Sequence, residues 1–282
     1  MLNMTAIDVI TDDLQRLGIP FKSNMVSNGY LFDMELVAKA KEKWKLQWIQ
    51  ITLDGTEAVH NAAKSFIYSD KSPYIRIMRN IDLLLDAAIE VTIRLNMNRE
   101  NAEDLSRLIE SLAERFGTKK GLTVYIGLLT DFLGTGSSVA QDDSTIEAYR
   151  ALTEKTRKYG LNHEALKDSI SINGCMADND SSLSILPDGH LGKCEHESEE
   201  KLVGSIYSDE LNNEMLSEWK ERVFSSKCKN CVHYPQCRRL KLCAWEANGC
   251  TEVRRMQSTI LLQNEIVNTY MAEKAKEHLC EA

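Results

Sequence analysis

Apolar residues in the first 160 positions alternate between a helical and a strand-like spacing. Apolar residues every three or four positions indicate helices, and short apolar or β-branched runs that end at turn residues indicate strands. The first helical face holds Ile7, Ile10, Leu14 and Leu17, and that helix ends at Gly18. The strand-like runs are the stretch that begins at Phe21 and the segments WIQITL, EVTIRLN and LTVYIGLL. The pattern therefore predicts helices that alternate with strands, beginning and ending on a helix.

This alternation implies an α/β fold in which parallel strands are joined by right-handed helical crossovers. Polar residues follow the predicted strands at Asn28, Asp54, Asn96 and Asn98. They predict a functional rim at the carboxyl ends of the strands, as in (β/α) barrels. The pattern opens on a helix, whereas a parallel sheet normally begins with a strand. We therefore expect a partial (β/α) barrel that lacks its first strands.

The character of the chain changes near residue 165, where the regular alternation stops. In the second region, residues 182–186 and the turn 187–189 predict a hairpin. Residues 209–224 and 252–277 predict two helices, the second of them long and terminal. We expect a partial barrel over residues 1–164 and a small cysteine-rich module with a C-terminal helix over residues 165–282.

Composition narrows the functional classes that need to be considered. The chain has 282 residues, of which 43% are apolar, and a formal net charge of -8. This acidic balance argues against a nucleic-acid partner, because phosphate binding needs clustered lysine and arginine. The sequence shows no secretory signal pattern and no apolar run long enough to span a membrane. We expect a cytoplasmic protein with reduced cysteines and no membrane partner.

Seven of the eight cysteines fall between residues 175 and 250, and their spacing is typical of metal or cluster ligands. They are Cys175, Cys194, Cys228, Cys231, Cys237, Cys243 and Cys250. Thiolates are soft ligands, and four of them satisfy one 4Fe–4S cluster or one tetrahedral zinc ion. Seven thiolates fit two iron–sulfur clusters, although Cys-x2-Cys followed by further cysteines also suits zinc. Cys280 stands apart on the terminal helix and is interpreted as an ordinary thiol.

These cysteines resemble the SPASM domain of radical S-adenosylmethionine (SAM) enzymes. The upstream segments SNGYLF, QITLDGTEAVH and IRLNMNREN, together with a helix start at Asn80-Ile81, resemble later strands and helices of the radical SAM partial barrel. The resemblance covers nearly the whole chain. SPASM-bearing relatives commonly modify ribosomally made peptides or activate sulfatases, so a peptide or protein substrate is implied.

The resemblance also implies cofactors and the residues that hold them. One or two auxiliary 4Fe–4S clusters are implied: the first takes Cys175, Cys194, Cys243 and an unidentified fourth ligand. The second takes Cys228, Cys231, Cys237 and Cys250. Thr52 and Arg94 are implied as contacts of S-adenosylmethionine. In a complete enzyme, reductive cleavage of this cofactor would give a 5′-deoxyadenosyl radical that removes a hydrogen atom from an unactivated carbon.

Two features depart from the family pattern. The chain contains no CxxxCxxC motif, which would hold the initiating cluster, and no glycine-rich GGEP-like turn. We therefore expect the later two-thirds of a radical SAM protein, or a split enzyme in which a separate chain carries the missing barrel strands. The alternative is a non-catalytic zinc- or cluster-binding scaffold for a protein partner. In addition, the family's His-Asp-x-x-Arg reads His60-Asn-Ala-Ala-Lys64 here, and lysine lacks the planar fork with which arginine binds a carboxylate.

Overall fold

A computed structural model gives the structure of the chain in two compact units. The first unit comprises Met1–Ala165 and Ile260–Ala282, and the second comprises Leu166–Thr259. The structure describes residues 3–64, 72–98, 100–117, 119–129, 143–164, 166, 175–195, 199–224, 226–234, 237, 240–242 and 252–280. Each unit is built around a sheet of its own.

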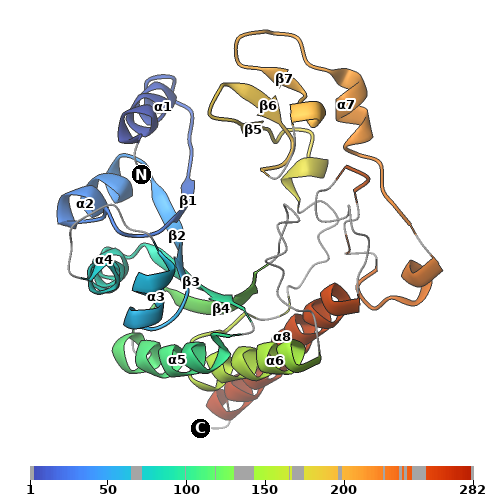
Figure 1. The fold of residues 1–282 in the computed structure, drawn as a ribbon. Coiled ribbons are helices and arrows are strands. Elements are labelled where there is room, and N and C mark those ends of the chain that lie inside the picture. The colour runs from blue at the N-terminus through green and yellow to red at the C-terminus, as the bar shows by residue number, and fades with distance from the viewer. Residues whose placement is uncertain are drawn as a thin grey trace. The chain divides into compact units, whose positions relative to one another are not determined.

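The sheet of the first unit has four parallel strands in the order β1-β2-β3-β4 (Figure 1). The strands are β1 (Ser23–Ser27), β2 (Leu46–Leu53), β3 (Glu90–Met97) and β4 (Leu122–Leu128). The helices of this unit are α1 (Met4–Arg16), α2 (Met34–Glu42), α3 (Glu57–Ala63), α4 (Pro73–Asp86), α5 (Ala102–Phe116) and α6 (Asp143–Lys158). Strand order equals chain order and each crossover is helical, which is the arrangement of an open (β/α) barrel. The predicted α/β partial barrel is confirmed.

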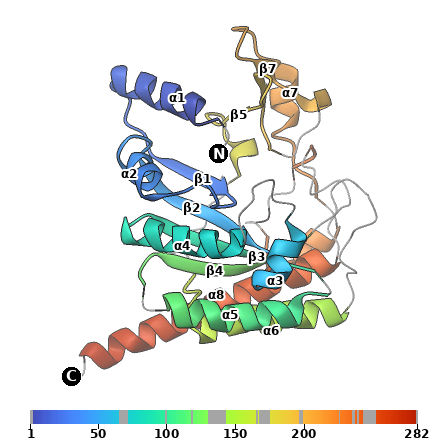
Figure 2. The same ribbon diagram turned by 60° about the vertical axis from the view of Figure 1, so that its left-hand side comes forward.

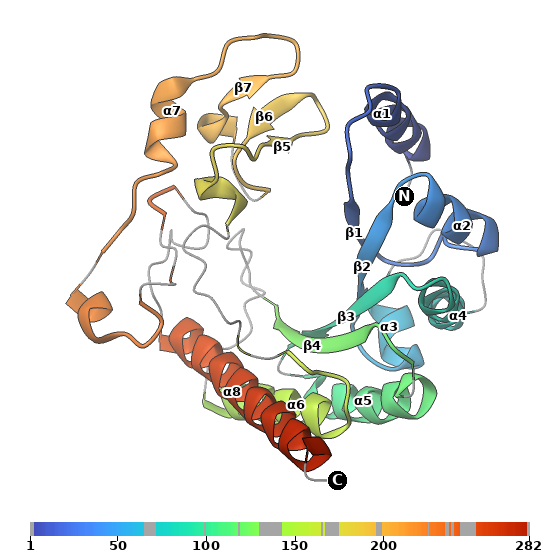
Figure 3. The same ribbon diagram turned by 180° about the vertical axis from the view of Figure 1, so that it is seen from behind.

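The helices cover one face of this sheet, as Figures 1 and 3 show for α2, α4 and α5. Alternate strand residues point to this face and form the core, because successive side chains of a strand point to opposite sides. The core positions of β2 and β3 are fully buried: Ile49, Ile51, Leu53, Val91, Ile93, Leu95 and Met97. The intervening residues of both strands are only partly buried and mostly polar, among them Gln50, Thr52, Thr92 and Arg94. The opposite face of the sheet is therefore polar and half-buried, which suits a ligand-binding surface better than a second core layer.

Helix boundaries follow local capping chemistry, and this corrects one sequence interpretation. The α4 helix begins after Ser72, whose hydroxyl accepts a hydrogen bond from Ile75 N at 3.3 Å, and Pro73 occupies the first turn. Asn80 and Ile81 therefore lie in the middle of α4 and do not start a helix. Asn80 is 3% exposed and its amide donates to the carbonyl oxygens of Gly29 and Tyr30 at 2.9 and 3.0 Å. Its role in the structure is to tie the turn after β1 to this helix.

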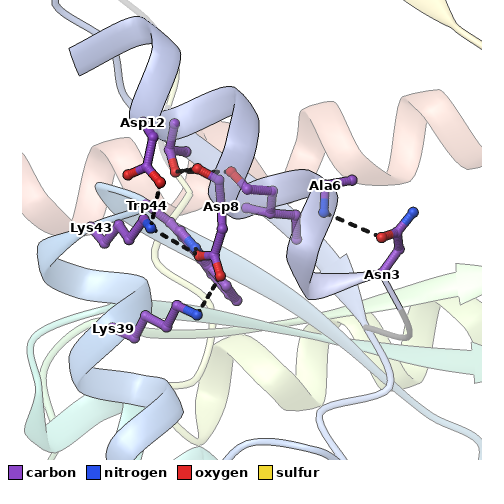
Figure 4. A network of polar contacts seen from close by, with 9 residues as sticks. Asn3, Ala6, Asp8, Asp12, Lys39, Lys43 and Trp44 are labelled. Atoms are coloured by element: carbon purple, nitrogen blue, oxygen red, sulfur yellow. Dashed lines mark hydrogen bonds and ion pairs between the residues drawn. The ribbon is translucent and has the colours of Figure 1, made fainter. Parts of the chain in front are cut away.

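The first helix, α1, has the predicted extent but not the predicted burial. It ends before Gly18, whereas Ile10 and Leu17 of its expected apolar face are largely exposed. Polar contacts attach it to α2 instead, as Figure 4 shows. Asp8 accepts hydrogen bonds from the Trp44 indole at 2.8 Å and from Lys39 Nζ at 2.5 Å.

The terminal helix α8 (Glu252–Cys280) agrees with the prediction of a long C-terminal helix. From Ile260 onward it belongs to the first unit, where Figure 2 shows it beside α6. Arg150 of α6 donates to the Gln263 side chain at 2.7 Å, and the Asn268 amide donates to Glu164 O at 2.8 Å. Among the described residues, no helix combines the length and apolar character needed to cross a membrane.

The second unit contains a small antiparallel sheet of β5 (Ser184–Ile185), β6 (His190–Gly192) and β7 (Gly204–Ser205). The pairing of β5 with β6 around the turn at 187–189 confirms the predicted hairpin. Short 3-10 helices occur at Met176–Asp178, Glu199–Lys201 and Ser226–Asn230. The predicted helix over 209–224 is shorter: α7 is Asn213–Glu218, because the Asn212 side chain caps it by accepting from Met215 N at 3.0 Å.

Candidate functional site

The polar face of the first sheet brings the two predicted cofactor-contacting residues together. Thr52 of β2 is the register partner of Arg94 in β3, and Arg94 is the partner of Tyr125 in β4. One row of the sheet thus runs Thr52, Arg94, Tyr125. Gln50 lies one step back on the same face, because residues two apart in a strand point to the same side.

Tyr125 and Gln50 are members of this site that sequence reasoning missed. The Tyr125 hydroxyl donates to Gln50 Oε1 at 2.9 Å. Burial raises the pKa of Tyr125, and the adjacent positive charge and hydrogen bond of Arg94 partly oppose that rise. The sequence held a signal for Gln50, which lies two residues before Thr52 in the strand and therefore points to the same side. Only the strand register could show that Tyr125 lies beside Arg94.

The Arg94 side chain lies against Gly127 of β4. A Cβ atom added at Gly127 would sit 2.4 Å from Arg94 Nε and 3.1 Å from both Cγ and Cζ. Within the described part of the chain, this buried Nε has no hydrogen-bond partner. The guanidinium is therefore held where only a glycine leaves space for it.

The rim at the carboxyl ends of β2 and β3 is organised by Asp54. Its carboxylate accepts from the Asn96 amide at 3.0 Å and lies 3.0 Å from Lys64 Nζ and 3.3 Å from His60 Nδ1. Burial alone would raise the pKa of Asp54, but hydrogen bonds from His60, Asn96 and Lys64 outweigh it and hold that pKa well below its usual range. The Asp54 carboxylate is therefore a fixed negative charge, and it engages Lys64.

The loop after β3 is locked to the loop after β2 by side chains. The Asn101 amide donates to the carbonyl oxygens of Asp54 and Asn96 at 2.8 Å each. Asp104 accepts from the Thr56 backbone N at 2.6 Å and from the Thr56 hydroxyl at 2.8 Å. The predicted polar rim is present at Asp54 and Asn96, and these contacts make it rigid. Asn28, by contrast, serves a local turn by accepting from Tyr30 N at 3.1 Å.

Five of the seven predicted ligand cysteines lie within the described residues: Cys175, Cys194, Cys228, Cys231 and Cys237. Cys175 and Cys194, distant in sequence, pack against the same small core, which includes Leu191, Val203 and Trp219. Cys243 and Cys250 lie outside the described residues.

Cys228, Cys231 and Cys237 are placed by consecutive backbone turns. Cys231 N donates to Cys228 O at 3.2 Å, and Cys237 N donates to His233 O at 2.7 Å. Among the described residues, no three histidine, cysteine or acidic side chains gather as metal ligands do. The thiols fit a thiophilic metal or cluster by their chemistry, and complete ligand sets would have to include the two cysteines outside the described ranges.

Comparison with known proteins shows which proteins the chain is similar to. No protein-family model matches the chain. Over 136 residues the chain is 25% identical to Fe-coproporphyrin III synthase of Methanosarcina barkeri (strain Fusaro / DSM 804), a match that covers 47% of this chain and 32% of that protein. The matched segment thus spans about a third of the length of this curated relative.

Solved structures match over most of the chain. The structure of native anSMEcpe with bound AdoMet aligns with a TM-score of 0.62 at 14% identity, over 90% of this chain and 76% of that one. The anSMEcpe complex with AdoMet and the Kp18Cys peptide gives 0.61 at 15% identity, over 90% and 77%. Streptococcus suis SuiB bound to its precursor peptide SuiA gives 0.50 at 16% identity, over 86% and 57%.

The alignment with anSMEcpe, a structure solved with bound AdoMet, covers both the parallel sheet and most of the rest of the chain. The chain has the radical SAM/SPASM fold, and the resemblance seen in its sequence is confirmed.

Proposed function

We propose that this chain binds S-adenosylmethionine on the polar face of its parallel sheet and takes part in the radical-based modification of a peptide or protein. The observation that carries the proposal is the row formed by Thr52, Arg94 and Tyr125 on a half-buried face whose reverse side is the hydrophobic core. Polar side chains are gathered on a rigid sheet here, and the fold is one that binds this cofactor in anSMEcpe.

The residues of this face fit the polar groups of the cofactor. Arg94 offers a planar fork of donors that matches a carboxylate, and the Thr52 hydroxyl can donate or accept beside it. Lys64 is engaged by Asp54 at 3.0 Å, which leaves the carboxylate contact to Arg94 in our proposal. When bound, S-adenosylmethionine supplies the chemistry of hydrogen-atom abstraction, and the protein supplies orientation and exclusion of water.

We also propose that the cysteines hold two auxiliary 4Fe–4S clusters. Cys175, Cys194 and Cys243 belong to the first, with a fourth ligand still to be assigned. The second is held by Cys228, Cys231, Cys237 and Cys250. Two observations support this proposal: Cys175 and Cys194 pack against one shared core, and a backbone turn joins Cys228 to Cys231.

The substrate that we propose is a peptide or a protein segment. The similar structures of anSMEcpe and SuiB were obtained with bound peptides, and a peptide partner for this chain is inferred from that likeness. The comparisons favour neither a non-catalytic scaffold nor a separate chain that supplies further strands.

Cofactor binding is tested by isothermal titration calorimetry of the full chain with S-adenosylmethionine. We expect saturable binding that Arg94→Gln weakens by about ten- to a hundredfold, because a charge-assisted hydrogen bond to a carboxylate is lost. Lys22→Gln, an exposed residue outside the row, is the matched control and should leave the affinity unchanged. Absence of binding by the unaltered chain would reject the proposal.

Cluster binding is tested by anaerobic reconstitution with iron and sulfide. The protein should turn brown with broad visible absorption, and Cys231→Ala should lower the iron content, whereas Cys280→Ala should not. A colourless protein that holds stoichiometric zinc would contradict the cluster assignment and favour the scaffold.

A further inference from the structure

The Arg94 side chain adopts a position that has an energetic cost. Its Nε is buried, and in the described part of the chain it has no hydrogen-bond partner. An unsatisfied buried N–H is unfavourable, and the guanidinium could avoid the cost by turning toward solvent. A side chain kept in this position requires neighbours that fix it there.

Two neighbours in β4 provide that constraint. Gly127 supplies space: a Cβ at this position would come within 2.4 Å of Arg94 Nε, so alanine would displace the guanidinium. Tyr125, the register partner of Arg94, supplies a polar contact on the same face. The Tyr125 hydroxyl is itself held by its hydrogen bond to Gln50 in β2.

The direction of the side chain follows from the register. Gly127 is paired with Asn96, which lies two residues beyond Arg94 in β3. The Arg94 side chain therefore leans toward the carboxyl end of the sheet, where Asn96 donates to the Asp54 carboxylate. This places its positive charge on the side of the sheet at which barrels of this kind bind ligands.

We propose that Gly127 and the Tyr125–Gln50 pair are positioning residues that aim the Arg94 guanidinium at the carboxylate of S-adenosylmethionine. The inference rests on the proposed function, which assigns Arg94 to that carboxylate. It also says which part of the cofactor the three residues help to bind, namely the amino-acid part and not the adenosine part.

The test compares two ligands on the full chain by calorimetry. The first ligand is S-adenosylmethionine, and the second is 5′-methylthioadenosine, which lacks the carboxylate. Gly127→Ala should weaken the binding of S-adenosylmethionine by about tenfold, the loss expected for a misplaced charge-assisted hydrogen bond. It should leave the affinity for 5′-methylthioadenosine unchanged. Tyr125→Phe should act in the same direction, and Thr123→Val, on the same strand and face but one step away, should affect neither ligand.

A double-mutant cycle separates positioning from a general structural effect. In an Arg94→Gln background, Gly127→Ala should cause no further loss of affinity, because residues that act through one another are not additive. Equal weakening of both ligands, or additive losses in the double variant, would overturn the inference.

A second measurement needs no ligand and separates failure of the inference from failure of the proposed function. Ultraviolet titration, with Tyr125→Phe as the reference for assignment, follows the ionisation of Tyr125. Gly127→Ala should raise the pKa of Tyr125, because the guanidinium charge that opposes its rise moves away. If the unaltered chain binds no S-adenosylmethionine, the proposed function fails. If the Tyr125 pKa is unchanged by Gly127→Ala, the positioning itself is wrong.

Discussion

At Asp54, burial and hydrogen bonding act on one carboxyl group in opposite directions. Its side chain is 13% exposed, and desolvation favours the neutral acid. The hydrogen bonds from His60, Asn96 and Lys64 favour the carboxylate and prevail, so the pKa of Asp54 in the folded state lies below that in the unfolded chain. This difference links the stability of the rim to pH.

We predict that Asp54→Asn lowers the free energy of unfolding by about 2 kcal/mol at pH 7, because the hydrogen bonds to the carboxylate are lost. Because the pKa of Asp54 is lower in the folded state, its carboxylate stabilises the fold at pH values above about 4, which is its pKa in the unfolded chain. This stabilisation is lost as the pH falls from there toward the folded-state pKa. The difference between variant and unaltered chain should therefore shrink at pH 3. Urea unfolding at both pH values measures it.

Asp13→Asn is the control for this prediction, since Asp13 pairs with Arg16 on the exposed surface of α1. Such a pair contributes about 0–1 kcal/mol, so the control should change stability little at either pH. A difference for Asp54→Asn that stays the same at pH 3 and pH 7 would show that the carboxylate charge is not what stabilises the rim.

At the scale of elements, α1 is attached mainly by polar contacts. Only Thr11 of this helix is buried, and Val9 and Ile10 are more than half exposed. Much of the attachment is made by Asp8, which accepts hydrogen bonds from the Trp44 indole and Lys39 and lies 3.6 Å from Lys43. Hydrogen bonds from Lys39 and Trp44 lower the pKa of Asp8 despite desolvation. Asp8 therefore makes more of the contacts that hold α1 than Asp12 and Gln15, each of which contacts Lys43 at 2.9 Å.

We predict that Asp8→Ala accelerates hydrogen exchange of the α1 amides, because the buried Trp44 indole loses its acceptor and Lys39 loses its ion-pair partner, while Lys43 keeps Asp12. Mass spectrometry of peptides from residues 4–16 measures the change. Asp13→Ala, whose partner Arg16 is in the same helix, is the control and should have little effect. Equal exchange in both variants would mean that α1 is held by other contacts.

At the scale of the whole molecule, the two units have cores of very different size. The first buries continuous rows of aliphatic residues between a four-stranded sheet and its helices. Among the described residues, the core of the second comprises Ala177, Leu191, Val203, Trp219 and Leu240, with Cys175 and Cys194 packed against it. A small core supplies little stability, so units of this kind depend on cross-links or bound metal.

We predict that loading the proposed clusters protects the second unit selectively. Amides of residues 175–242 should exchange more slowly after reconstitution with iron and sulfide, whereas those of β2 and β3 should not change. Hydrogen exchange with and without reconstitution, with Cys231→Ala as the unloaded reference, tests this. Uniform protection of both units would show that the cysteines stabilise the chain in some other way.

The periodicity of apolar residues was enough to predict the larger helices and strands but not the short ones. The four strands and the long helices have enough residues for the spacing of apolar positions to be unambiguous. The seven-residue α3 helix was not predicted, and α7 was predicted too long, because a helix of two turns or fewer hardly establishes a period. Local caps such as Asn212, and not periodicity, set those boundaries.

By itself, the sequence determined the alternating fold, the polar rim and the spacing of the cysteines, because each of these depends on residues that lie close together in the chain. Only the tertiary structure decided that Gln50, Tyr125 and Gly127 surround Arg94, and that Lys64 serves Asp54. These contacts depend on strand register and on loops that meet across the sheet. Register is fixed by packing the whole apolar face at once, and no local pattern records which polar residues that packing brings side by side.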